Sequence, residues 1–153
     1  MRTIKRERRC MMSHVTVIEM EEEYTLPVLR QMCKDQGWEW LEGQRTYRWY
    51  NQFMGDYPLP VGFTRDDLGR CDHAIRIPGA SYEIGVVKKG GEWKLLWDFW
   101  KSGGLQQKLG RNAGLLKRSY GMAKTRITAN KHRKRCYQRP VKQKGWTKLV
   151  VEI

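Results

Sequence analysis

Several signatures of common functional classes are missing from this sequence. Its 153 residues contain no apolar run near the roughly 18 residues that a membrane-spanning helix needs, and no signal-peptide apolar region near the start. The four cysteines include no Cys-x-x-Cys pair, which favours free thiols over a zinc site. Gly103-Gly104 is not followed by the Gly-Lys-Ser/Thr of a phosphate-binding loop. We therefore expect a cytoplasmic protein, in a bacterial or phage-infected cell, without a metal or cofactor.

Acidic residues are absent from one long segment. Residues 105–148 contain fourteen Lys and Arg but no Asp or Glu, whereas the rest of the chain is neutral. This segment therefore accounts for the whole formal net charge of +14. Such an asymmetry indicates an oriented electrostatic field and a polyanionic partner. An acidic protein partner, or a solvated face that only confers solubility, are the two alternatives.

The first functional hypothesis is non-enzymatic binding of RNA or DNA through phosphate contacts, without sequence specificity. The residues expected to make these contacts are Lys108, Arg111, Lys117, Arg118, Lys124, Arg126, Lys131, Arg133, Lys134 and Arg135. Most Trp and Tyr residues fall at predicted core positions, and the candidates for exposed stacking surfaces are Trp49, Tyr50, Tyr57 and Trp100. The sequence contains no RNA-recognition aromatic pair, zinc finger or helix-turn-helix motif.

Residue types that could support catalysis are few. Cys71-Asp72-His73 places three reactive side chains together, but neighbours on a strand point to opposite faces. Asp98 falls among large apolar residues, where an unpaired carboxylate is costly to bury. It therefore predicts either a structural ion pair with a basic residue or an active-site carboxylate. An enzyme centred on His73 and Asp98 is the third functional hypothesis, and the absence of a catalytic motif favours a non-enzyme.

The hydrophobic pattern predicts one α+β domain over residues 12–153, with a mostly antiparallel sheet and two helices packed on one face. Strands are expected at 14–18, 38–41, 46–50, 73–77, 82–88, 92–100, 137–142 and 146–153, with helices at 24–36 and 105–133. The second helix has weak points at Gly110, Gly114 and Gly121. Residues 51–70 predict an ordered loop with a helical turn at 64–68, and residues 1–11 either a disordered basic arm or a misassigned start before Met12.

Several short segments resemble the "domain of unknown function 1257" family, whose members include the hypothetical chloroplast frame 35 proteins and phage versions. The similar segments are 12–18, 72–76, 82–86, 95–100 and 145–153. The chain resembles the phage branch but departs from the family in the acid-free segment, where family members have a mixed-charge helix and Glu-rich strands. The resemblance implies a fold, no established enzymatic activity, and an AAA-type ATPase as a partner. The second functional hypothesis is thus an accessory or inhibitor protein, phage-encoded or ATPase-associated, that docks on an acidic protein surface.

Overall fold

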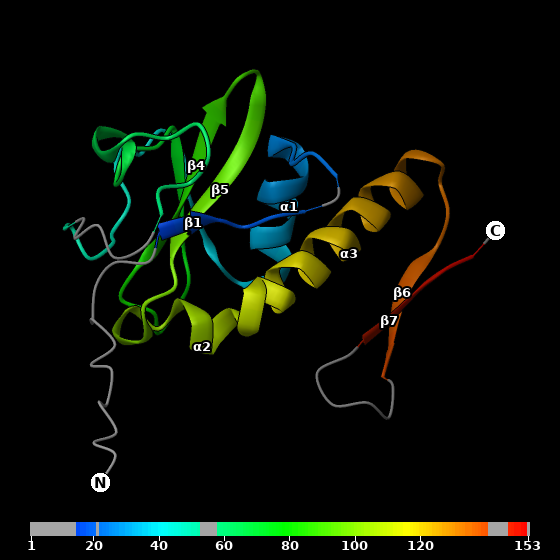
Figure 1. The fold of residues 1–153 in the computed structure, drawn as a ribbon. Helices are drawn as coiled ribbons and strands as arrows, with labels where there is room; N and C mark the ends of the chain where they lie inside the picture. Colours follow the sequence, from blue (N-terminus) through cyan, green and yellow to red (C-terminus); the bar gives the residue numbers. More distant parts are fainter. Residues whose placement is uncertain (1–14, 21, 53–57, 141–146, 153) are drawn as a thin grey trace, which may run out of the picture.

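The computed structural model describes residues 15–20, 22–52, 58–140 and 147–152 (Figure 1). Five antiparallel strands form the main sheet in the order β1-β5-β4-β3-β2, and two further strands form a separate hairpin. The strands are β1 (Val15–Val17), β2 (Glu39–Leu41), β3 (His73–Arg76), β4 (Glu83–Lys89), β5 (Glu92–Asp98), β6 (Cys136–Pro140) and β7 (Thr147–Val151). The helices are α1 (Leu26–Gln36), α2 (Leu105–Leu109) and α3 (Gly114–Lys131), with 3-10 turns η1 (Arg65–Asp67), η2 (Lys101–Gly103) and η3 (Arg111–Ala113). The predicted α+β class is confirmed.

Helices α1 and α3 pack against each other and against one face of the sheet. Alternate residues of β5, Leu95 and Trp97, face these helices in the larger core cluster. The buried hydroxyl of Tyr120 on α3 accepts a hydrogen bond from Thr25 N–H (2.9 Å) and donates one to Glu23 C=O (3.2 Å). This side chain therefore joins α3 to the start of α1.

The segment between β2 and β3 covers the opposite face of the sheet. Tyr47, Phe63 and Leu68 from this segment are buried against Ala74 and Leu96 in a second core cluster. The predicted helical turn is present as η1, where Thr64 and Asp67 form a reciprocal capping box. The observed contacts over 58–70 are those of an ordered loop, although Val61 is almost fully exposed.

The strand predicted over 46–50 is wrong. Thr46 forms only an isolated bridge with Arg70. At the following residues the backbone turns to other partners, because Tyr47 N–H donates to Gly69 C=O (3.0 Å) and Arg48 N–H donates to the Glu83 carboxylate (3.1 Å). A buried carboxylate thus takes the hydrogen bond that a strand neighbour would otherwise accept.

The helix predicted over 105–133 is interrupted at one of its three glycines. Gly110 has φ 80° and ψ 173°, so it ends α2, and Asn112 and Ala113 also have positive φ before α3 begins. Helix α3 then continues through Gly121. Both helical pieces still bury their apolar stripe, which includes Leu105, Leu109, Leu116, Tyr120 and Ala123.

The β6–β7 hairpin lies beside α3, away from the main sheet (Figure 1). The described residues that form the two buried core clusters include none from this hairpin. Leu149, Val150 and Val151 are only half-buried. Because they are only half-buried, these side chains retain apolar surface that a partner could cover. An isolated two-stranded hairpin is marginally stable in water, so such a contact would also stabilise the hairpin.

Several predictions lie wholly or partly outside the described residues. They concern residues 1–11, expected to be a basic arm or a misassigned start, residues 53–57 of the predicted loop with Tyr57, and the ends of the strands predicted over 14–18, 137–142 and 146–153. Among the helices that are described, none is both long and apolar enough to cross a membrane.

Candidate nucleic-acid interface

The ten predicted phosphate-binding residues are spread along α2, η3, α3 and the turn before β6. Lys108 lies in α2 and Arg111 in η3, before α3 begins, whereas Lys131 is the last residue of α3. At 1.5 Å per residue, the 18 residues of α3 span about 27 Å. The structure therefore does not gather the ten side chains into one cluster.

Within the described part of the chain, acidic residues lie beside at least three of the ten cations. Lys124 forms an ion pair with Glu22. Arg126 Nε lies 3.9 Å from a carboxylate oxygen of Asp35, and Arg135 lies 3.9 Å from Glu152. The exposed pairs of Lys124 and Arg135 contribute about 0–1 kcal/mol to stability. The Arg126 Nε is buried beside Asp35. In all three pairs the carboxylate competes with a phosphate for the cation. These three residues are weaker candidates for nucleic-acid contacts than the sequence indicated.

The C-terminal end of α3 carries the densest group of uncompensated cations. Lys131, Arg133 and Lys134 are exposed and form no ion pair with any residue that the structure describes. Arg133 has φ 54°, and Lys134 N–H donates to Ala129 C=O (2.8 Å), so the chain reverses here and enters β6. The turn holds these cations close together at the junction of helix and hairpin.

Two further exposed cations lie on the hairpin itself. Arg139 on β6 is the register partner of Lys148 on β7, and Tyr137 lies on the same face two residues earlier. The Arg139 guanidinium lies 5.4 Å from the Tyr137 ring centroid. Arg139 lies five residues beyond Lys134, about 17 Å along an extended strand. We call the five residues Lys131, Arg133, Lys134, Arg139 and Lys148, which extend from the end of α3 along the hairpin, the terminal basic cluster. Arg139, Lys148 and Tyr137 are not among the site residues predicted from the sequence, although the alternation of the predicted hairpin could have placed them together.

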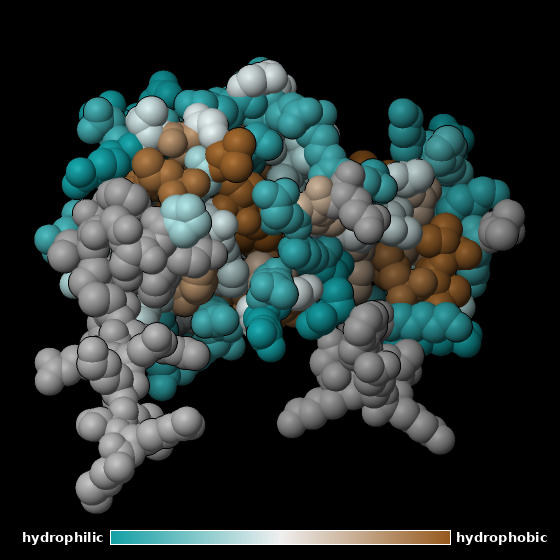
Figure 2. All heavy atoms as spheres, viewed as in Figure 1, coloured by the Kyte–Doolittle hydropathy of each residue, from teal (hydrophilic) through white to brown (hydrophobic). Residues whose placement is uncertain are grey.

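A groove of about 800 Å³ is lined by α3, the segment before α1, the turn after α3 and the end of β7. Met20, Tyr120, Ala129 and Val151 supply its apolar lining. Its charged lining residues are of both signs and include Glu19, Glu22, Lys117, Lys124 and Lys134. Figure 2 shows hydrophobic surface over the hairpin, bordered by hydrophilic side chains. The terminal basic cluster therefore lies next to a recess with apolar surface.

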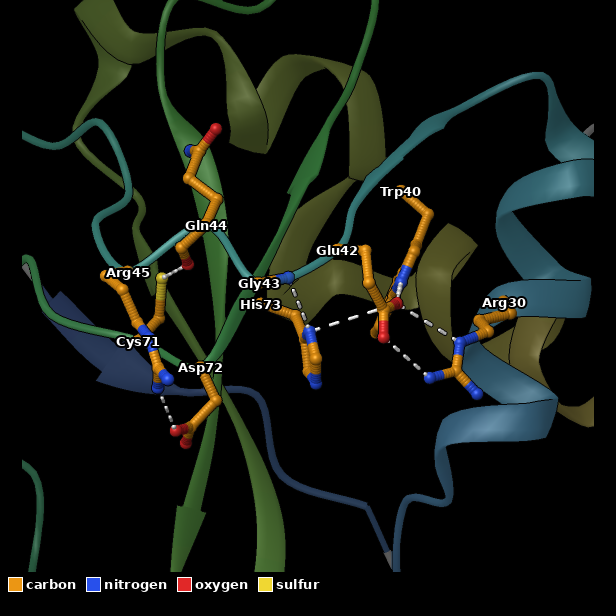
Figure 3. Close-up of polar contacts among 9 residues, drawn as sticks. All are labelled: Arg30, Trp40, Glu42, Gly43, Gln44, Arg45, Cys71, Asp72 and His73. Carbon is orange, nitrogen blue, oxygen red and sulfur yellow. Dashed lines mark hydrogen bonds and ion pairs between the residues drawn. The ribbon is translucent and has the colours of Figure 1, made fainter.

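His73 and Asp98 lie on opposite faces of the main sheet. His73 faces the helices, between Trp40 and Trp93, and its Nδ1 accepts a hydrogen bond from Gly43 N–H at 2.9 Å (Figure 3). Asp98 shares the other face with Leu96, is fully buried, and accepts the N–H groups of Tyr50 (3.1 Å) and Trp100 (3.0 Å). The structure does not bring the two side chains into one pocket.

Glu42 Oε2 lies 3.9 Å from His73 Nδ1, but the side chains of Cys71 and Asp72 point away from His73. Cys71 Sγ contacts Gln44 C=O, and Asp72 pairs with Arg45 at 3.3 Å, both away from the imidazole (Figure 3). Burial raises the pKa of the Cys71 thiol to about 12, which leaves it protonated and a poor nucleophile at neutral pH. The Cys71-Asp72-His73 sequence therefore does not form a catalytic group.

The described candidates for exposed aromatics lie far from the hairpin in the fold. Tyr50 is 38% exposed, while Trp49 and Trp100 are half-buried. Trp49 packs with the second core cluster, which lies on the sheet face opposite α3. The aromatic residue that accompanies the terminal basic cluster is instead Tyr137.

Comparison of the chain with family models, curated proteins and solved structures gave no match. The resemblance to the "domain of unknown function 1257" family therefore stays a prediction. Within the described parts of the chain, no three His, Cys, Asp or Glu side chains form a group suited to a metal ion.

Proposed function

We propose that this chain binds nucleic acid, RNA or DNA, through phosphate contacts made by the terminal basic cluster. The observation that supports the proposal is that cations at the end of α3 have no carboxylate partner among the described residues, whereas two cations earlier in α3 have one. Lys124 and Arg126 on α3 have carboxylate partners, whereas Lys131, Arg133 and Lys134 have none among the described residues. Uncompensated cations that converge at one turn create a local positive potential, which attracts a polyanion and releases its counterions.

The hairpin adds two elements that suit a flexible strand. Arg139 and Lys148 offer phosphate contacts beyond the helix end, and Tyr137 offers an aromatic ring on the same face. Phosphate contacts do not depend on sequence, and stacking on one ring tolerates every base. We therefore expect non-specific binding, with a Kd of about 10⁻⁴–10⁻⁶ M at physiological salt.

The test is fluorescence anisotropy with a labelled oligonucleotide, performed at several salt concentrations. Five phosphate contacts predict a slope of log affinity against log salt of about −4.5 for duplex DNA and about −3.5 for single strands. The fall in affinity between 50 and 200 mM salt is then about 500-fold and about 100-fold, respectively. The triple variant K131Q/R133Q/K134Q should lower the magnitude of the duplex slope by about 2.7.

The matched control is the double variant K108Q/R111Q, which removes cations of the same acid-free segment before α3 begins. We expect this control to retain most of the affinity and most of the salt slope. Binding that ignores salt would overturn the proposal, and so would an equal loss in the control and the triple variant.

An acidic protein surface is the second candidate partner. The hydrophobic surface over the hairpin favours it, since protein interfaces combine an apolar centre with a polar rim (Figure 2). Capture of partners from a lysate with and without nuclease treatment separates the two functions. Partners that are lost after nuclease treatment support nucleic-acid binding, and direct partners that persist and also require Lys131, Arg133 and Lys134 support protein docking.

A further inference from the structure

A second cationic cavity lies on the face of the sheet opposite α1 and α3. It has a volume of about 600 Å³ and is bounded by the segment after β2, the residues after η1, and strands β3 and β4. Arg48, Arg70 and Arg76 line it together with a single acidic residue, Glu83. The cavity therefore carries an excess of positive charge, and its volume falls in the range typical of small-molecule sites.

One arginine and the glutamate form the structural base of this cavity. The Glu83 carboxylate is only 2% exposed and accepts hydrogen bonds from Arg76 Nε, Arg48 N–H and Gln44 Nε2, each at 3.1 Å. Arg76 extends its other arm to Glu39 at 3.1 Å. Because Glu83 and Arg76 compensate each other, the charge available to a ligand comes from Arg48 and Arg70.

The two remaining arginines have exposed side chains on a fixed backbone. Arg48 C=O accepts the Glu83 N–H (2.9 Å), and Arg70 N–H donates to Asp67 C=O (3.1 Å). Neither guanidinium forms an ion pair within the described residues. Two arginines that line one cavity from separate segments suit a phosphate, since a guanidinium presents a planar set of donors to its oxygens.

An aromatic wall completes the cavity. Trp49 is half-buried, and its indole lies so close to Gly69 that a Cβ atom there would clash with the indole nitrogen. Gly69 also has φ 82°, so both its backbone conformation and this close contact require glycine. The indole is thereby held beside Arg48 and Arg70, where it offers a flat surface for a planar ring.

We propose that this cavity binds a free mononucleotide, with its phosphate on Arg48 and Arg70 and its base against Trp49. A phosphate alone would use the arginines but not the indole, and a nucleoside alone would use the indole but not the arginines. The site is separate from the terminal basic cluster, because it lies on the opposite face of the sheet.

The test is isothermal titration calorimetry of the full chain with adenosine, cytidine, guanosine and uridine monophosphates. Inorganic phosphate and the free nucleosides are the ligand controls. We expect at least one monophosphate to bind at least tenfold more tightly than either control. The double variant R48Q/R70Q should lose at least tenfold in monophosphate affinity, whereas Trp49→Leu should weaken nucleotide binding without changing phosphate binding.

Arg45→Gln is the matched protein control, because Arg45 is an exposed arginine of the same segment that pairs with Asp72 and does not line the cavity. Circular dichroism of each variant confirms that it is folded. Absence of monophosphate binding at millimolar concentrations would overturn the proposal. So would equal affinities of R48Q/R70Q and R45Q, or equal affinities for a nucleotide and for phosphate. The triple variant K131Q/R133Q/K134Q should retain nucleotide binding, so this site and the terminal basic cluster can fail independently.

Discussion

Replacement of Asp98 tests how the second face of the sheet is held together. Its carboxylate is fully buried and accepts two backbone N–H groups, one on each oxygen, from Tyr50 and Trp100. A hydrogen bond to a charged group contributes about 1.5–3 kcal/mol, so Asp98→Ala should lose about 3–6 kcal/mol of unfolding free energy. That is a large share of the roughly 5–15 kcal/mol by which most domains are stable.

Asp98→Asn removes only one of the two hydrogen bonds. The amide keeps one acceptor oxygen but turns its NH₂ group toward the other N–H, so we expect a loss of about 1.5–3 kcal/mol. In urea unfolding followed by circular dichroism, with a slope of about 2 kcal/mol/M, the midpoint of Asp98→Ala should fall by about 1.5–3 M. The reasoning is refuted if Asp98→Ala stays within about 1 kcal/mol of the unmodified protein, or if Asp98→Asn is the less stable of the two.

Two further predictions concern groups with displaced pKa values. Burial raises the pKa of the Cys33 and Cys71 thiols to about 12, so at pH 8 a thiol reagent should label the half-buried Cys136 well before either of them, as peptide mapping would show. Hydrogen bonds from Trp40 and then Arg30 lower the pKa of Glu42 below its usual 4.5. The ionised Glu42 carboxylate therefore stabilises the fold above about pH 4.5, and this contribution is lost as the pH falls through the folded-state pKa. In urea unfolding, Glu42→Gln should lose less stability than the unmodified protein between about pH 5 and pH 3. An equal loss in both proteins would contradict the stabilising role of the Glu42 carboxylate.

The sequence predicts most of the sheet because its strands alternate strongly. In β5, Trp93, Leu95 and Trp97 alternate with residues of the other face, and the structure confirms that the helices cover this apolar side. The alternation places Leu96 and Asp98 on the other face, but it does not show which residues cover them, because that cover comes from an irregular segment joined by long-range contacts. The wrong strand over 46–50 has the same origin, since the Glu83 carboxylate that redirects Arg48 N–H is 35 residues away in the sequence.

The candidate site also depends on contacts between residues that are far apart in the sequence. Fourteen basic residues without an acidic neighbour in sequence indicated one binding segment, but sequence distance does not show which carboxylates lie nearby in space. Glu22 and Asp35 lie far from α3 in the sequence and reach it only because α1 and the segment before it pack beside α3. Both cationic sites depend on which charges remain uncompensated after folding, and that requires the tertiary structure.

The separation of the hairpin from the core also has an evolutionary consequence. The buried residues that hold the domain together come from the main sheet, its covering loop and the helices, whereas the terminal basic cluster lies at the end of α3 and on the hairpin. Substitutions on the hairpin surface therefore cost little folding free energy, since exposed positions usually change stability by only about 0.5 kcal/mol. Selection can alter the charge of this appendage, and with it the choice of partner, while the scaffold that carries it stays intact.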